Sequence, residues 1–224
     1  MTAAQELTPT EPKKKSGLAA INEDEFDALT VIGGWRVIVE AVTPTIIFLV
    51  GLNLTGDYLL PAGLALGFTS IAALIRLIQR LPVRPALIGV LSMTASVFVA
   101  WKTGQAVNVF AISILKNTFY GSLLLISILV RWPLLGVMLG AVRGEKTRWR
   151  KGEEWKLTRL RYYQITWIWF FVFVARLSVQ IPLYFTDNVQ WLALMKLSLG
   201  MPADIVAAYF SWRLLRTLRH RHLV

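Results

Sequence analysis

Long apolar stretches, separated by short polar or basic ones, make up most of this chain after residue 36. About 20 apolar residues in a helix cross the hydrocarbon core of a bilayer. A spanning segment must also satisfy its own backbone hydrogen bonds, and a helix does so. The pattern therefore predicts an all-α polytopic bundle of about six transmembrane helices, over residues 37–54, 59–78, 86–101, 107–130, 164–185 and 191–212.

Prolines, glycines and cations mark the ends and interruptions of these helices. The stretch from Arg80 to Pro85 carries two cations and two prolines, which together end a helix. Gly200 and Pro202 interrupt the last apolar stretch, so we expect a kink there. Residues 134–142 are apolar but too few to span, so this segment either lies at the interface or extends a neighbouring helix.

Positive charge gathers on one side of the predicted bundle. If the N-terminus is cytoplasmic, twenty of the 24 Lys and Arg residues are cytoplasmic. Four of them precede the first helix, three lie around the connection between the second and third helices, nine lie from Arg131 to Arg161, and four lie at the C-terminus. The only cation in an outer loop is then Lys102. Cytoplasmic loops carry an excess of Lys and Arg, so we expect both termini on the cytoplasmic side of the cell (inner or plasma) membrane.

The chain divides into three parts by composition. Residues 1–30 are polar and predict a flexible cytoplasmic tail; the alternative is a short helix, capped at Asn22, whose acidic residues dock on the basic loop. Residues 31–218 form the six-helix domain, which includes a basic cytoplasmic loop at 143–161. Residues 219–224 form a short basic cytoplasmic tail.

Overall composition agrees with a membrane protein and excludes several kinds of site. The chain is 55% hydrophobic and 17% charged, with a mean hydropathy of +0.55. Its net charge of +11 does not indicate a nucleic-acid partner, because the cations lie between apolar stretches. There is no Cys, and the two His residues lie near the C-terminus, so we expect no cofactor and no metal site.

Ionisable side chains inside a bilayer cost about 2.5 to 3.5 kcal/mol each, so each needs a partner or water. Glu40 and Arg76 lie at similar depths near the inner ends of the first two helices and could pair; the alternative for Glu40 is to extend to the inner interface. Lys196 lies one turn from Trp191, near the outer end of the last helix, where we expect it to reach the outer interface.

A polar centre is expected near the middle of the membrane. Arg176 and Gln180 lie one turn apart on one helix. Asp204 is the carboxylate nearest the midplane, so it is the natural partner of Arg176 or of Lys116, and Asn117 follows Lys116 directly. Such a group either forms part of a substrate or ion pathway or acts as a structural ion pair that fixes helix register.

Several short motifs follow one another in a distinctive order along the chain: Gly33-Gly34-x-Arg36, Glu40-x-x-x-Pro44, Arg76-x-x-x-Arg80, Trp101-Lys102-Thr103-Gly104, Asn117-x-x-Tyr120, Arg131-x-Pro133-Leu134 and Arg176-Leu177-x-x-Gln180-x-Pro182-Leu183-Tyr184. This order resembles the actinobacterial domain-of-unknown-function-3159 family of multi-pass membrane proteins. The fourth helix and the following Arg131 to Leu134 are more distantly similar to the intracellular septation protein A family. The resemblance implies a membrane location and no particular activity.

Two functions are compatible with these features. The first is a small-solute or ion transporter, or a transport accessory, whose polar centre lies within the membrane. The second is a cell-envelope or division scaffold whose basic loop binds anionic lipid or a membrane-protein partner, a second copy included, through Arg143, Lys146, Arg148, Arg150 and Lys151. We do not expect an enzyme, because a single carboxylate near the midplane offers no acid and base pair.

Overall fold

The computed structural model describes residues 27, 29, 34–145 and 147–219, and this part of the chain contains helices and no strand. Six helices or helix pairs are long and apolar enough to cross a membrane, as predicted. In chain order the elements are α2 (Trp35–Thr55), α3 (Leu59–Ile78), α4 (Arg84–Thr103), η2 (Ala106–Phe110), α5 (Ala111–Leu129), α6 (Leu134–Val142), η3 (Arg148–Arg150), α7 (Lys156–Phe185), α8 (Val189–Ser198) and α9 (Met201–Arg219).

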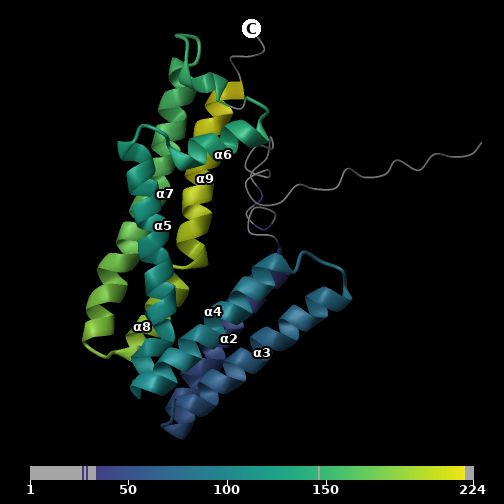
Figure 1. Ribbon diagram of the computed structural model, residues 1–224, viewed down its shortest axis with the longest axis vertical. Helices are drawn as coiled ribbons and strands as arrows, with labels where there is room; N and C mark the ends of the chain where they lie inside the picture. The colour runs from purple at the N-terminus through teal and green to yellow at the C-terminus, as the bar shows by residue number, and fades with distance from the viewer. Residues whose placement is uncertain (1–26, 28, 30–33, 146, 220–224) are drawn as a thin grey trace, which may run out of the picture.

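The spanning helices form two units that diverge from a common end (Figure 1). In the first unit α2 packs on α3 and α3 packs on α4; in the second, α7 packs on both α5 and α9, and α6 packs on α7. The units meet where α8 and η2 lie, because α2 contacts α8 there and α4 contacts η2 and α5. The basic ends of the two units are therefore spread apart, and we call the shared end the junction.

Separate hydrophobic cores hold the junction and the second unit. The junction core joins α2, α3, α4, η2 and α8, and its buried members are Phe48, Ala62, Ala65, Ala100, Val107, Val109, Phe110, Leu192 and Ala193. The other core lies at the basic end of the second unit and contains Leu139, Trp149, Tyr162, Ile165, Ala208, Leu215 and Leu218. Neither core fills the space between the diverging units.

Polar and aromatic contacts at the junction join particular side chains, in addition to the hydrophobic packing. The Tyr184 hydroxyl of α7 donates a hydrogen bond to the Asn108 side chain in η2, and that side chain donates to Thr103 at 2.7 Å. Phe48 and Phe110 meet edge to face with centroids 5.7 Å apart. Helices that are far apart in the sequence are thus joined by specific contacts at this end.

Several boundaries differ from those expected. α4 begins at Arg84, because Pro85 is tolerated in the first helical turn, where its missing N–H has no helical partner. α7 begins at Lys156, eight residues before the expected 164, so part of the basic loop is helical. Residues 134–142 form a helix of their own, α6.

The last span is interrupted where predicted. α8 ends at Ser198 and α9 begins at Met201. A Cβ on Gly200 would lie 2.6 Å from the carbonyl oxygen of Lys196, so the close backbone approach at this break requires glycine. The predicted tail, with its alternative helix at Asn22, lies outside the described residues apart from Asp27 and Leu29, and so do residues 220–224.

Candidate functional site

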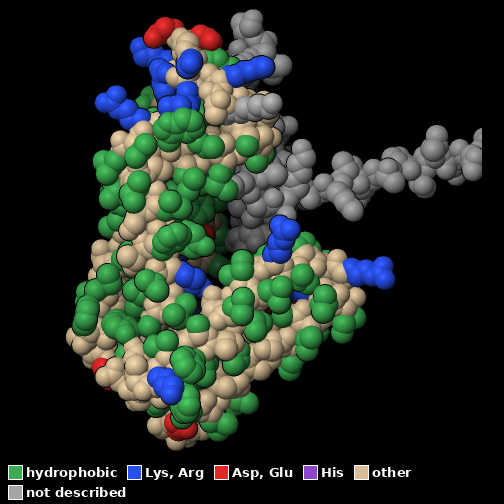
Figure 2. All heavy atoms as spheres, in the orientation of Figure 1, with side chains coloured by type: hydrophobic (Ala, Val, Ile, Leu, Met, Phe, Trp, Pro, Cys, Tyr) green, Lys and Arg blue, Asp and Glu red, His purple; other side chains and the backbone are tan. Residues whose placement is uncertain are grey.

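The space between the two units contains adjoining cavities with polar walls. Two of them have volumes of about 290 Å³ each and share the wall residues Ala41, Thr45, Ser113 and Lys196. The space-filling view shows the surface hollowed between the units, with charged side chains inside (Figure 2). We call this region the cleft. Ligand sites of transporters and bundles are concave regions of this kind, although roughly 300 to 1,000 Å³ is more usual.

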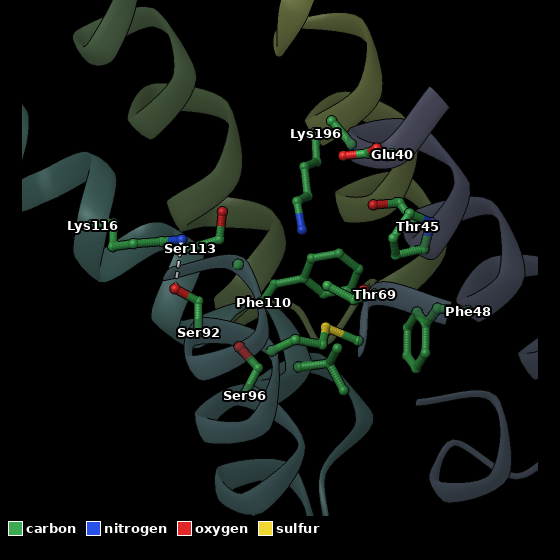
Figure 3. Close-up of a pocket in the computed structure, with 15 residues that line it drawn as sticks. Glu40, Thr45, Phe48, Thr69, Ser92, Ser96, Phe110, Ser113, Lys116 and Lys196 are labelled. Atoms are coloured by element: carbon green, nitrogen blue, oxygen red, sulfur yellow. Dashed lines mark hydrogen bonds between the residues drawn. The ribbon is translucent and has the colours of Figure 1, made fainter. Parts of the chain in front are cut away.

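The first cavity is built mainly from side chains of the first unit and from α5. Ser92 and Ser96 are one turn apart on α4, and Ser113 and Lys116 are one turn apart on α5, so each pair presents one polar face. Figure 3 shows Lys116 and Lys196 extending into this cavity from different helices. The Lys116 ammonium donates a hydrogen bond to the Ser92 hydroxyl at 3.2 Å.

The second cavity contains the ion pair between Arg176 and Asp204. The guanidinium of Arg176 donates from Nη2 to Asp204 Oδ1 at 2.7 Å. It also donates from Nε to the Leu199 carbonyl at 2.6 Å and from Nη2 to the Gly200 carbonyl at 2.7 Å. Those carbonyls lie at the break between α8 and α9, and the Gly200 carbonyl also accepts a hydrogen bond from the Asp204 backbone N–H at 3.2 Å. Arg176 therefore holds both the carboxylate and the broken backbone.

The predicted polar centre is mostly assembled around this pair. Asn117 of α5 donates to Gln180 of α7 at 3.1 Å, and both side chains line the second cavity with Arg176 and Asp204. Lys116 lines the first cavity and bonds to Ser92, so the alternative pairing of Lys116 with Asp204 is not the one observed.

Glu40 forms the predicted pair with Arg76. Arg76 donates to Glu40 Oε2 from Nη2 at 2.6 Å and from Nε at 2.7 Å, and Arg36 donates to Oε1 at 2.8 Å. The Glu40 side chain is 18% exposed and is held by both arginines within the first unit. Glu40 and Arg76 also line a third cavity of about 210 Å³ that adjoins the first at Glu40, Ala41, Thr69 and Gly89.

Lys196 departs from its expected place. Its side chain lines both cavities instead of reaching the outer interface, and its ammonium lies 5.1 Å from the centre of the Phe110 ring. Proximity to Trp191 suggested the outer interface, but the break at Gly200 ends α8 early and the short helix lies at the junction (Figure 1). The sequence did not identify four residues of this site: Lys196, Ser92, Ser96 and Ser113. For Ser113, its position three residues before Lys116 was a signal that could have indicated it.

The basic loop is more folded than its composition suggests. Arg143 donates to Glu145 at 2.7 Å, with side-chain exposures of 10% and 11%, and the Tyr162 hydroxyl donates to the same carboxylate at 2.6 Å. The Arg150 guanidinium lies 3.6 Å from the centre of the Trp132 ring. Arg143 and Arg150 thus have partners within the fold.

The exposed part of the predicted basic surface is correspondingly small. Arg148 and Lys151 are exposed, and Lys146 lies outside the described residues. In the described part of the chain, no group of three or more His, Cys, Asp or Glu side chains could hold a metal ion.

A family model described as a protein of unknown function, DUF3159, matches residues 32–222. The chain belongs to the DUF3159 family. The match covers every residue that lines the cleft of this DUF3159 member. Neither the curated proteins nor the solved structures contain a match to the chain. Membership in this family describes no reaction or solute.

Proposed function

We propose that this DUF3159 member is a transport protein, or the membrane subunit of a transport system, that moves a small solute or ion through the cleft. The observation that carries the proposal is the set of charged and hydroxyl side chains on the cavity walls between two divergent helical units. Ionisable residues within membrane helices are costly and mark pathways when they face a polar cavity.

The arrangement of the units supports movement as well as binding. The two units are joined at the junction core, while their basic ends have no shared core. Transporters commonly expose a central site by rocking one helical bundle against another. With the basic ends in the cytoplasmic leaflet of the cell membrane, the cleft would open inward. An enzyme is disfavoured because Glu40 and Asp204, the carboxylates on the cleft walls, are both paired with arginines.

An envelope or division scaffold is the second candidate, and the exposed Arg148 and Lys151 are the observation that favours it. A scaffold needs no polar cavity within the membrane, so solvent access to the cleft discriminates the two. The chain has no native cysteine, which makes single-cysteine labelling clean. Ser113→Cys faces the cleft, and Leu115→Cys, 63% exposed on the same helix, is the matched lipid-facing control.

The experiment treats inside-out and right-side-out vesicles with a charged, membrane-impermeant thiol reagent. We expect Ser113→Cys to react from the basic side and Leu115→Cys to remain unmodified from both sides, because a charged reagent does not enter lipid. Protection of Ser113→Cys from both sides would refute a solvent-filled cleft and favour the scaffold.

A further inference from the structure

The charges on the cleft walls do not balance. Four cations and two carboxylates line the three adjoining cavities: Arg76, Lys116, Arg176, Lys196, Glu40 and Asp204. Both carboxylates form ion pairs with arginines: Glu40 with Arg36 and Arg76, and Asp204 with Arg176. The remaining positive charge therefore belongs to the two lysines.

Neither lysine has an acidic partner among the described residues. Lys116 bonds to the neutral hydroxyl of Ser92, and Lys196 lies against the Phe110 ring. The two lysines come from α5 and α8, and both side chains line the same cavity of about 290 Å³. Two unneutralised ammonium groups that share a cavity within a membrane repel each other and attract an anion.

The cavity also offers neutral hydrogen-bond donors. The hydroxyls of Ser96 and Ser113 line the same walls as the lysines, and within the described part of the chain neither has a hydrogen-bond partner. Hydroxyl and ammonium groups together donate to the several acceptor oxygens of an oxyanion. A volume of about 290 Å³ restricts the ligand to a small one.

We propose that Lys116 and Lys196 form the binding site for a compact oxyanion, such as a carboxylate, phosphate or sulfate, in the cleft. The inference rests on the proposed function, because it names the class of solute that the cleft would carry. The ammonium groups approach the cavity from α5 and α8, and α2, α3 and α4 of the first unit supply most of the remaining wall. The anion would neutralise the charge that the protein leaves unpaired and would join α5 to α8.

Equilibrium binding to the full chain tests this site without any transport measurement. Purified protein in nanodiscs of neutral lipid is titrated with radiolabelled sulfate, phosphate or acetate at low ionic strength. We expect saturable binding of at least one of them, weakened at least about tenfold in Lys116→Gln and in Lys196→Gln. Lys102→Gln is the matched control, because Lys102 also lies over an aromatic ring, Trp101, but outside the cleft; its binding should equal that of the wild type.

A second measurement shows that the variants fold. Without added anion, Lys196→Gln should melt close to the temperature of the wild type, because the removal of a repelled charge offsets the loss of the contact with the Phe110 ring. A loss of stability larger than this ring contact explains would overturn the assignment, since it would mean that Lys196 already has an acidic partner. Absence of saturable anion binding by the wild type, or binding by both glutamine variants that equals that of the wild type, would also overturn it.

A lipid headgroup could supply the same oxyanion chemistry. Stabilisation by phosphatidylglycerol nanodiscs, with none by the free anions, would replace the soluble ligand with a lipid and refute the proposal. Anion binding and labelling of Ser113→Cys are independent measurements. A protein that binds no anion but is labelled at Ser113→Cys would refute the oxyanion site and leave the proposed transport function in place. A cleft sealed to the thiol reagent refutes transport without deciding whether the lysines bind an anion.

Discussion

Removing Arg176 should destabilise the protein more than removing its partner Asp204. Arg176 is 9% exposed and donates hydrogen bonds to Asp204 and to the carbonyls of Leu199 and Gly200. Arg176→Ala leaves an uncompensated carboxylate and removes the guanidinium hydrogen bonds to both carbonyls at the α8–α9 break; the Gly200 carbonyl keeps only its bond from the Asp204 backbone N–H. Breaking a buried pair from one side costs about 3 to 5 kcal/mol, and the lost backbone contacts keep the expected value in that range.

Asp204→Ala should cost less, because two of the three acceptors of Arg176 remain. The Asp204 side chain is also 38% exposed, which weakens the contribution of its charge. A lost hydrogen bond to a charged group is worth about 1.5 to 3 kcal/mol, and we expect the lower half of that range. The double variant should be no less stable than Arg176→Ala alone. Removing Asp204 adds no further cost, because it also removes the carboxylate that Arg176→Ala leaves uncompensated.

The assay is unfolding in detergent micelles, followed by far-UV circular dichroism, for the wild type, both single variants and the double variant. The cycle should give a coupling of about 0.5 to 3 kcal/mol. Arg213→Ala, an exposed arginine of α9, is the control and should change stability by less than about 0.5 kcal/mol. Additive effects of Arg176→Ala and Asp204→Ala would refute the coupling.

Three further predictions follow from the same structure. Single cysteines at Thr55, Gln105 and Asn188 should react with an impermeant reagent from outside intact cells, whereas Gly152→Cys and Leu223→Cys should not; external labelling of Leu223→Cys would contradict the six-span topology. Glu40→Gln should lower the free energy of unfolding by about 1 to 3 kcal/mol, because Arg36 and Arg76 lose their shared negative charge and one of its two acceptor oxygens. Unchanged chemical denaturation would contradict this, with Asp57→Asn in an exposed turn as control. Gly136→Ala should destabilise by about 1 to 3 kcal/mol, since its Cβ would lie 2.8 Å from Tyr162 Cβ, while Gly67→Ala, whose Cβ meets nothing within 4 Å, should not; equal melting temperatures of the two variants would refute the packing argument.

The spans and the main ion pairs could be predicted because few sequence features determine them. Helix length and apolar composition set the number of crossings, and the six predicted spans are present. Charges are so rare within these spans that each carboxylate had few possible partners, and this is why Glu40 with Arg76 and Arg176 with Asp204 could be proposed.

The divergence of the two units could not be predicted in this way. Hydropathy fixes how deep a residue lies and leaves open which side of its helix faces a neighbour, so the lysines could not be assigned to one cavity. Lys196 shows the consequence: its distance along the chain from Trp191 suggested an interface, whereas the broken helix directs it into the cleft. Charge density similarly indicated an exposed basic loop, but Arg143 is mostly buried against Glu145.

We expect the two units to move relative to each other about the junction and thereby to open and close the cleft. The distance between spin labels on Leu81→Cys, in the turn after α3, and Lys151→Cys, beside η3, measures the separation of their basic ends in lipid nanodiscs. We expect two distance populations, with weights that change when the Arg176 to Asp204 pair is removed. A single narrow population that the double variant leaves unchanged would contradict a moving cleft and identify the protein as a rigid scaffold.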